Sequence, residues 1–166
     1  GRAKQMNAGA KQANGSILYF LHADSFPPKH FNKHIINAVA QKKLAGCFRM
    51  RFNDSHWWLT LVAWFTRFNW KACRGGDQSL FVSKTVFEKL KGFNEAYIIY
   101  EDNHFIGKLY KHKTFTVLPY YLYTSARKYR SIGVWTLQYH FLIIYFKRAL
   151  GATPEALYAY YKTRIK

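Results

Sequence analysis

The sequence predicts an α/β fold in which a mostly parallel sheet is flanked by helices and followed by a helical C-terminal tail. Residues 16–21 and 79–83 are short, almost continuous apolar runs, typical of strands buried on both faces of a parallel sheet. These runs alternate with segments at helical spacing, as crossover connections between parallel strands require. With 166 residues, 49% of them hydrophobic, the chain is long enough for one domain with a core.

The first half of the chain carries clear start and stop signals. Ala, Gln and Lys favour a helix at the amino end, and Asn14-Gly15 is a stop signal. Pro27-Pro28 breaks the chain after the first apolar run. The patterns predict a helix over 1–14, a strand over 16–21, a helix over 29–43, a strand over 47–52 and an aromatic-rich helix over 56–70.

The second half begins with a backbone hinge at Gly75-Gly76. The patterns then predict a strand over 79–83, a helix from Lys84, a loop from Gly92, a helix over 102–110, a strand over 114–118 and helices over 134–146 and 154–161. We expect residues 1–120 to form one α/β portion. Residues 121–166 are expected to form a basic, aromatic helical extension packed on it.

The charge balance predicts an anionic partner. Lys and Arg number 26 against 8 Asp and Glu, a formal net charge of +18. Nucleic acid, anionic lipid and phosphorylated substrates all fit this charge. A nucleic-acid-binding module and a peripheral membrane-binding module therefore stay open as alternatives to an enzyme. No recognisable nucleic-acid motif accompanies the charge, so a specific nucleic-acid partner is not expected.

The remaining composition narrows the compartment and the chemistry. Cys47 and Cys73 have neither metal-type spacing nor the density of a secreted disulfide scaffold, which favours a reducing cytoplasm. The longest charge-free stretch, 131–146, is shorter than a bilayer span, so no transmembrane helix is expected. There is no nucleophile elbow and no Walker-type loop, which disfavours hydrolases and nucleotide triphosphatases.

Asp24 is the first candidate for chemistry. It follows an apolar strand and precedes the rigid pair Pro27-Pro28. A carboxylate in such an exposed turn can bind a hard divalent cation, with a diphosphate completing the coordination shell. The alternative is that Asp24 only caps a turn or a helix.

Glu101 and Asp102 are the second candidates, because they lie between the apolar residues 97–100 and a predicted helix. One carboxylate in such a position can cap the helix while the other faces a cleft as a general base. The alternative is that both only stabilise the amino end of the helix.

Two further groups are candidates for substrate binding. Gly76, Asp77 and Gln78 place polar groups on a flexible backbone, which suits hydrogen bonds to a polyhydroxylated substrate, with an ordinary turn as the alternative. Arg127 and Arg130, with Lys128 between them, can neutralise a diphosphate leaving group or bind anionic lipid. A solvated basic loop is the alternative there.

Taken together, the segments resemble the family 2 glycosyltransferases, most closely the bacterial selenodomain-associated subgroup. The likeness lies in several motifs in the right order along nearly the whole chain. They are GRAKQMNAGA (1–10), LYFLHADS (18–25), GDQSLFV (76–82), GFNE (92–95) followed by YED (100–102), and TSARKY (124–129).

This resemblance implies a GT-A-type, Rossmann-like fold that lacks the family's N-terminal nucleotide-binding strands. Residues 1–120 would then be the catalytic portion, which carries the metal-binding and acceptor-side segments. It also implies inverting transfer of a sugar from a nucleotide-diphosphate sugar to an acceptor hydroxyl, with a lipid-linked acceptor as one option. Asp102 would be the general base with Glu101 beside it. Asp24 would hold Mn²⁺ or Mg²⁺, with His22 at the position where many relatives have a second Asp.

The first motif looks like the subgroup's nucleotide-proximal helix, which makes Arg2 and Asn7 candidates for binding the donor. The expected location is the cytoplasm, with peripheral association with the inner face of the membrane as an option. An anionic membrane surface is then a further expected partner, because the extension is strongly basic.

Overall fold

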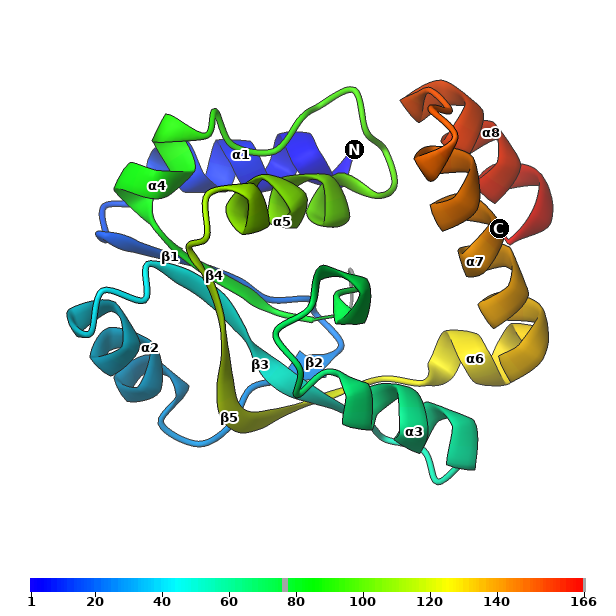
Figure 1. The fold of residues 1–166 in the computed structure, drawn as a ribbon, viewed down its shortest axis with the longest axis horizontal. Helices are drawn as coiled ribbons and strands as arrows, with labels where there is room; N and C mark the ends of the chain where they lie inside the picture. Colours follow the sequence, from blue (N-terminus) through cyan, green and yellow to red (C-terminus); the bar gives the residue numbers. More distant parts are fainter. Residues whose placement is uncertain (76–77, 166) are drawn as a thin grey trace.

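The computed structural model describes residues 1–75 and 78–165, in which five strands form one sheet (Figure 1). The strands are β1 (Ile17–Phe20), β2 (Ser25–Phe26), β3 (Ala45–Phe52), β4 (Leu80–Ser83) and β5 (Phe115–Thr124). The helices are α1 (Arg2–Gln12), α2 (Phe31–Ala40), α3 (Trp57–Phe65), α4 (Lys84–Lys89), α5 (Glu101–Lys111), α6 (Arg127–Ile132), α7 (Val134–Ala149) and α8 (Pro154–Arg164), with a 3-10 turn η1 (Lys71–Cys73). The positions of most elements agree with the sequence patterns, whereas β2 and α6 were not predicted.

The expected mostly parallel, Rossmann-like sheet of the GT-A type is wrong. The strand order is β1-β4-β3-β5-β2, and β3 with β5 is the one parallel pair among the described strands. β4 runs antiparallel to both β1 and β3, and β2 runs antiparallel to β5. The prediction failed because an apolar run that is buried on both faces looks the same whichever way its neighbours run. Here helices cover both faces of an antiparallel strand.

Alternating side chains of the strands enter two cores, one on each face of the sheet. Leu80 and Val82 of β4 pack with residues of α1, α4 and α5, whereas Phe81 between them packs with residues of α2, α3 and the C-terminal helices. Figure 1 shows α1, α4 and α5 on one side of the strands and α2 and α3 on the other. This arrangement explains why the strands read as continuous apolar runs rather than as polar–apolar alternation.

The parallel pair of β3 and β5 depends on two local features. A Cβ atom at Gly46 would lie 2.3 Å from the carbonyl oxygen of Thr116, so only glycine fits this close approach. Farther along, the partners of Phe48 and Arg49 are Leu118 and Tyr121, so the pairing skips Pro119 and the residue after it. Proline lacks the N–H that the ladder needs, which suits it to such a bulge.

The C-terminal segment completes one of the two cores. Strand β5 continues past residue 120 and ends at Thr124, and helices α6, α7 and α8 follow it. Tyr129, Leu137, Ile144 and Leu157 of these helices are buried in the same cluster as Phe48 of β3. None of the helices in the described ranges has the length and apolar character needed to cross a bilayer.

Candidate active site

The candidate site lies where three strands end at the same edge of the sheet. β3 and β5 are parallel, and β1 runs in their direction because β4 is antiparallel to both β1 and β3. The carboxyl ends of β1, β3 and β5 therefore point the same way, although the sheet is mixed. His22 and Asp24 follow β1, and Ser125 and Arg127 follow β5.

Two of the sequence motifs meet at this edge. Ser25 in β2 pairs with Thr124 in β5, and their hydroxyl oxygens lie 2.9 Å apart. The backbone N–H of Ser125 donates to the carbonyl oxygen of Asp24 at 3.2 Å. The segment around Asp24 is thus joined directly to the segment that carries Arg127, two residues after Ser125.

Glu101 and Asp102 form the first turn of α5. The helix lies on the sheet because Phe105, Ile106 and Leu109 are buried in the core shared with α1 and α4. Carboxylates in a first turn are favoured by the partial positive charge at the amino end of a helix. Glu101 is 0% exposed and Asp102 is 8% exposed, so both carboxylates are buried and only Asp102 keeps some accessible surface.

Arg2, His22, Glu101 and Asp102 form a charged cluster, which we call the carboxylate cluster. The Nε of Arg2 lies 2.7 Å from Oε1 of Glu101, and its guanidinium extends to 3.8 Å from Oδ2 of Asp102. Nε2 of His22 is 3.9 Å from the same Asp102 oxygen. Two segments that are distant in the sequence therefore converge on the two buried carboxylates of a third, and Arg2 supplies the positive charge that such burial requires.

In the segment just before α5, Tyr97 is buried and Tyr100 is partly buried. Burial raises the pKa of Tyr100, an effect that the positive charge of Arg148 partly offsets. The ring of Tyr100 lies 5.6 Å from that of Tyr145 in α7, and the Arg148 guanidinium lies 5.7 Å from the centre of the Tyr97 ring. Helix α7 thus packs against the segment just before the carboxylate cluster.

Asp24 is better suited to binding a cation together with substrate phosphates than to forming a complete metal site with other side chains. Its side chain is exposed, and the described residues contain no group of three His, Cys, Asp or Glu positioned to hold a metal ion. Mg²⁺ and Mn²⁺ are commonly held by one or two carboxylates together with substrate phosphates. Asp24 is able to supply one such ligand, whereas His22 faces Asp102.

Asn7 and Gln78, two of the predicted substrate-binding residues, form hydrogen bonds with other residues of the protein. The Asn7 amide donates to the carbonyl of Phe93 at 2.9 Å and to Glu95 at 3.0 Å, and it accepts from the Phe93 N–H at 3.0 Å. Gln78 is buried, accepts from Arg74 at 3.0 Å and donates to the carbonyl of Cys73 at 3.0 Å. Gly76 and Asp77 lie outside the described residues.

The predicted basic residues lie beside the strand ends. Arg127 is exposed, whereas Arg130 forms an ion pair with Asp54 at 2.9 Å. The N–H of His56 and the Arg130 guanidinium both lower the pKa of Asp54, the backbone bond having the larger effect. Asn53 accepts a 2.7 Å hydrogen bond from the N–H of Ala126.

Asn53 and Asp54 lie beside the same strand ends, and the sequence analysis did not identify them as candidate residues. They follow the predicted strand over 47–52, just as Asp24 follows the strand before it. The rule that pointed to Asp24, that functional groups gather at the carboxyl ends of strands, would also have found them.

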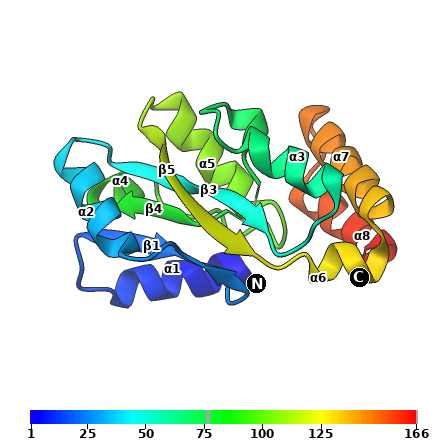
Figure 2. The same ribbon diagram turned by 90° about the horizontal axis from the view of Figure 1, so that it is seen from below.

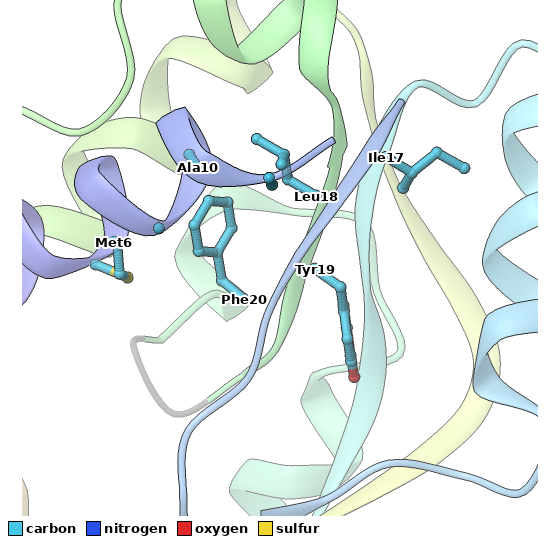
Figure 3. Close-up of a pocket in the computed structure, with 8 residues that line it drawn as sticks. Met6, Ala10, Ile17, Leu18, Tyr19 and Phe20 are labelled. Atoms are coloured by element: carbon cyan, nitrogen blue, oxygen red, sulfur yellow. The ribbon is translucent and has the colours of Figure 1, made fainter. Parts of the chain in front are cut away.

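Two hollows in the surface lie away from the carboxylate cluster. One, of about 250 Å³, lies between α1 and β1 and is lined by residues that include Met6, Ala10, Leu18 and Phe20. Figure 3 shows Leu18 and Phe20 on the α1 side of the strand and Tyr19 pointing away from it. The other, also of about 250 Å³, lies between α1 and α4. Neither hollow is lined by Asp24 or by the carboxylates of α5, so the strand ends remain the candidate site.

No protein-family model matches the chain. No curated protein matches it either.

Proposed function

We propose that this protein is a glycosyltransferase that moves a sugar from a nucleotide-diphosphate sugar to an acceptor hydroxyl with inversion. The observation that carries the proposal is the carboxylate cluster, in which Arg2, His22 and Asp102 come from three separate motif segments and meet. The proposal rests on this cluster and on the likeness of the motifs, and it does not depend on a parallel sheet.

Asp102 is the general base of the proposed reaction. Its carboxylate takes the proton of the acceptor hydroxyl as the hydroxyl oxygen bonds to the anomeric carbon. The bond from that carbon to the diphosphate breaks, and its electron pair leaves with the nucleoside diphosphate. Glu101 is fully buried against Arg2, so it is a positioning residue that holds this guanidinium beside Asp102.

In the proposed reaction, the departing diphosphate lies at the ends of β1 and β5. Asp24 would hold a divalent cation, Mn²⁺ or Mg²⁺, which when bound supplies positive charge that stabilises the leaving diphosphate. Arg127 is exposed close by and adds a guanidinium suited to phosphate oxygens. Arg130 has a weaker claim to this role because Asp54 already pairs with it.

The proposed location is the cytoplasm. Both cysteines are free, Cys47 buried and Cys73 partly buried, which suits a reducing compartment. Cytoplasmic nucleotide sugars would then be the donors, and a lipid-linked hydroxyl is one acceptor that the proposal accommodates.

Calorimetric titration with uridine diphosphate and with guanosine diphosphate tests the donor site. We expect one of them to bind in the presence of Mn²⁺ and to lose at least about tenfold in affinity without it. Asp24→Asn should abolish the Mn²⁺ dependence. Glu155→Gln removes an exposed acid of α8 and should leave binding unchanged. Failure of both nucleotides to bind, or unchanged Mn²⁺ dependence in Asp24→Asn, would contradict the proposal.

A further inference from the structure

The outer side of α7 is apolar, although its inner side already supplies the core. Leu137 and Ile144 face inward and are buried. At intervals of three or four residues, a second apolar row remains exposed. It consists of Trp135 (54% exposed), Tyr139, Leu142 (58%), Phe146 (66%) and Leu150 (73%). Monomeric soluble proteins rarely leave so many large apolar side chains together on one surface.

Helix α3 extends this surface. Trp57, Leu61, Trp64 and Phe65 are exposed on one side of α3, whereas Leu59 and Ala63 are buried on the other. The ring of Trp57 lies 5.8 Å from the ring of Trp135, and Trp58 lies 5.1 Å from it. The two helices therefore meet through tryptophans and form one surface, which we call the aromatic face. Figure 2 shows α3 and α7 next to each other at one end of the molecule.

The charge of the segment that contains α7 indicates the kind of partner. Residues 121–165 carry a single acid, Glu155, against seven basic residues: Arg127, Lys128, Arg130, Lys147, Arg148, Lys162 and Arg164. Within the face, the guanidinium of Arg67 lies 4.4 Å from the centre of the Trp64 ring. Tryptophan and tyrosine side chains favour the boundary between lipid and water, and neighbouring Lys and Arg favour anionic headgroups.

We propose that the aromatic face docks on the surface of an anionic membrane. α7 is 16 residues long and would lie in the interface, with its apolar row between the headgroups and the acyl chains. A second copy of the chain fits less well, because each copy carries a net charge of +18. Single-stranded nucleic acid fits less well too, because Leu61, Leu142 and Leu150 cannot stack on bases.

Docking in this way would bring the membrane to the helix that contacts the segment just before the carboxylate cluster. Tyr145 of α7 contacts Tyr100, and Arg148 of α7 lies over the ring of Tyr97. These two tyrosines belong to the segment that leads directly into Glu101 and Asp102. If the proposed transferase activity holds, the acceptor that this geometry favours is a hydroxyl carried by a membrane lipid.

Vesicle sedimentation tests the docking proposal without any assumption about catalysis. We expect the protein to pellet with vesicles of phosphatidylcholine mixed with phosphatidylglycerol, and much less with phosphatidylcholine alone. The triple variant Leu142→Ser, Phe146→Ser, Leu150→Ser should bind mixed vesicles at least about tenfold more weakly. These side chains are exposed, so an unchanged melting temperature should confirm that the variant is folded. Ile36→Ser removes an exposed apolar side chain from α2 and should bind as the unchanged protein does.

A second readout separates insertion from charge attraction alone. Brominated acyl chains should quench tryptophan fluorescence in mixed vesicles, because Trp57, Trp64 and Trp135 lie on the aromatic face. Absence of quenching, equal binding by the triple variant, or no pelleting with mixed vesicles would each overturn the proposal. The proposal would also be overturned if the protein formed a dimer that dissociates in the triple variant, because the occupant would then be a second copy. Oligonucleotide binding that is lost in the triple variant would overturn it in the same way, by identifying nucleic acid as the occupant. The nucleotide titration is performed without vesicles, so failure of the docking proposal and failure of the transferase proposal are distinguishable.

Discussion

Arg2 lies against Glu101, with 2.7 Å between its Nε and Oε1 of a carboxylate that has no exposed surface. The two residues belong to the first turns of α1 and α5, so one ion pair ties the amino end of the chain to the candidate active site. Oε2 of Glu101 has no hydrogen-bond partner within the described part of the chain. The charge of Arg2 is therefore the main compensation for burying this carboxylate.

Arg2→Met should destabilise the protein by about 1–3 kcal/mol, because it leaves a buried carboxylate without its counter-charge. The value is moderate because the Arg2 side chain is half-exposed and water screens the pair. Lys4→Met is the matched control: it removes an exposed positive charge from the same helix, and no ion pair of Lys4 is seen among the described residues. Urea unfolding measures both variants. Equal stability of the two would show that the pair is not needed.

His104 should make stability depend on pH. Burial lowers its pKa, and the positive charges of Lys108 and Arg148 lower it further. The folded protein then binds fewer protons at this site than the unfolded chain, in which a histidine titrates at about pH 6.5. The free energy of unfolding should therefore fall as the pH drops through about 6.5, and the contribution of His104 should be fully present above that value.

His104→Phe should reduce this loss, since phenylalanine keeps the ring that stacks on Tyr97 but cannot be protonated. Urea unfolding at about pH 7 and about pH 5 measures the difference. His112→Phe, at an exposed histidine just after the same helix, should keep the full pH dependence. The same slope in all three proteins would exclude His104 as its source.

Gly46 and Gly9 provide a matched pair for the packing of the sheet. A Cβ at Gly46 would collide with the carbonyl oxygen of Thr116, so Gly46→Ala should cost about 1–3 kcal/mol and weaken the β3–β5 pair. A Cβ at Gly9 meets nothing within 4 Å. Gly9→Ala in α1 should therefore stabilise the protein by about 0.5–1 kcal/mol. Thermal unfolding of both variants tests the sign of each effect, and a neutral Gly46→Ala would show that the two strands can separate at little cost.

The sequence located most elements and several candidate residues, because both leave local signals. Apolar runs and helical spacing mark elements, and acids that follow an apolar run stand out in a chain with so few of them. Asp24 and Asp102 were identifiable in this way.

The direction of β4 and the partners of distant residues leave no such signal. Nothing local distinguishes an antiparallel central strand from a parallel one when both are covered by helices. Likewise, nothing local indicates that Arg2 pairs with Glu101, or that Asn7 bonds to Phe93 rather than facing a substrate. These relationships are set by tertiary packing across most of the chain.

The most direct test of the central claim is the release of nucleoside diphosphate from a panel of uridine- and guanosine-diphosphate sugars, with Mn²⁺ and a hydroxyl acceptor. The unchanged protein should release product from at least one donor. Asp102→Asn should slow that release by a factor of about 10²–10⁴ while nucleotide binding persists, because the general base is lost and the donor site is kept. Release by Asp102→Asn at the unchanged rate, or no release by the unchanged protein from donors whose nucleotides bind, would contradict the account.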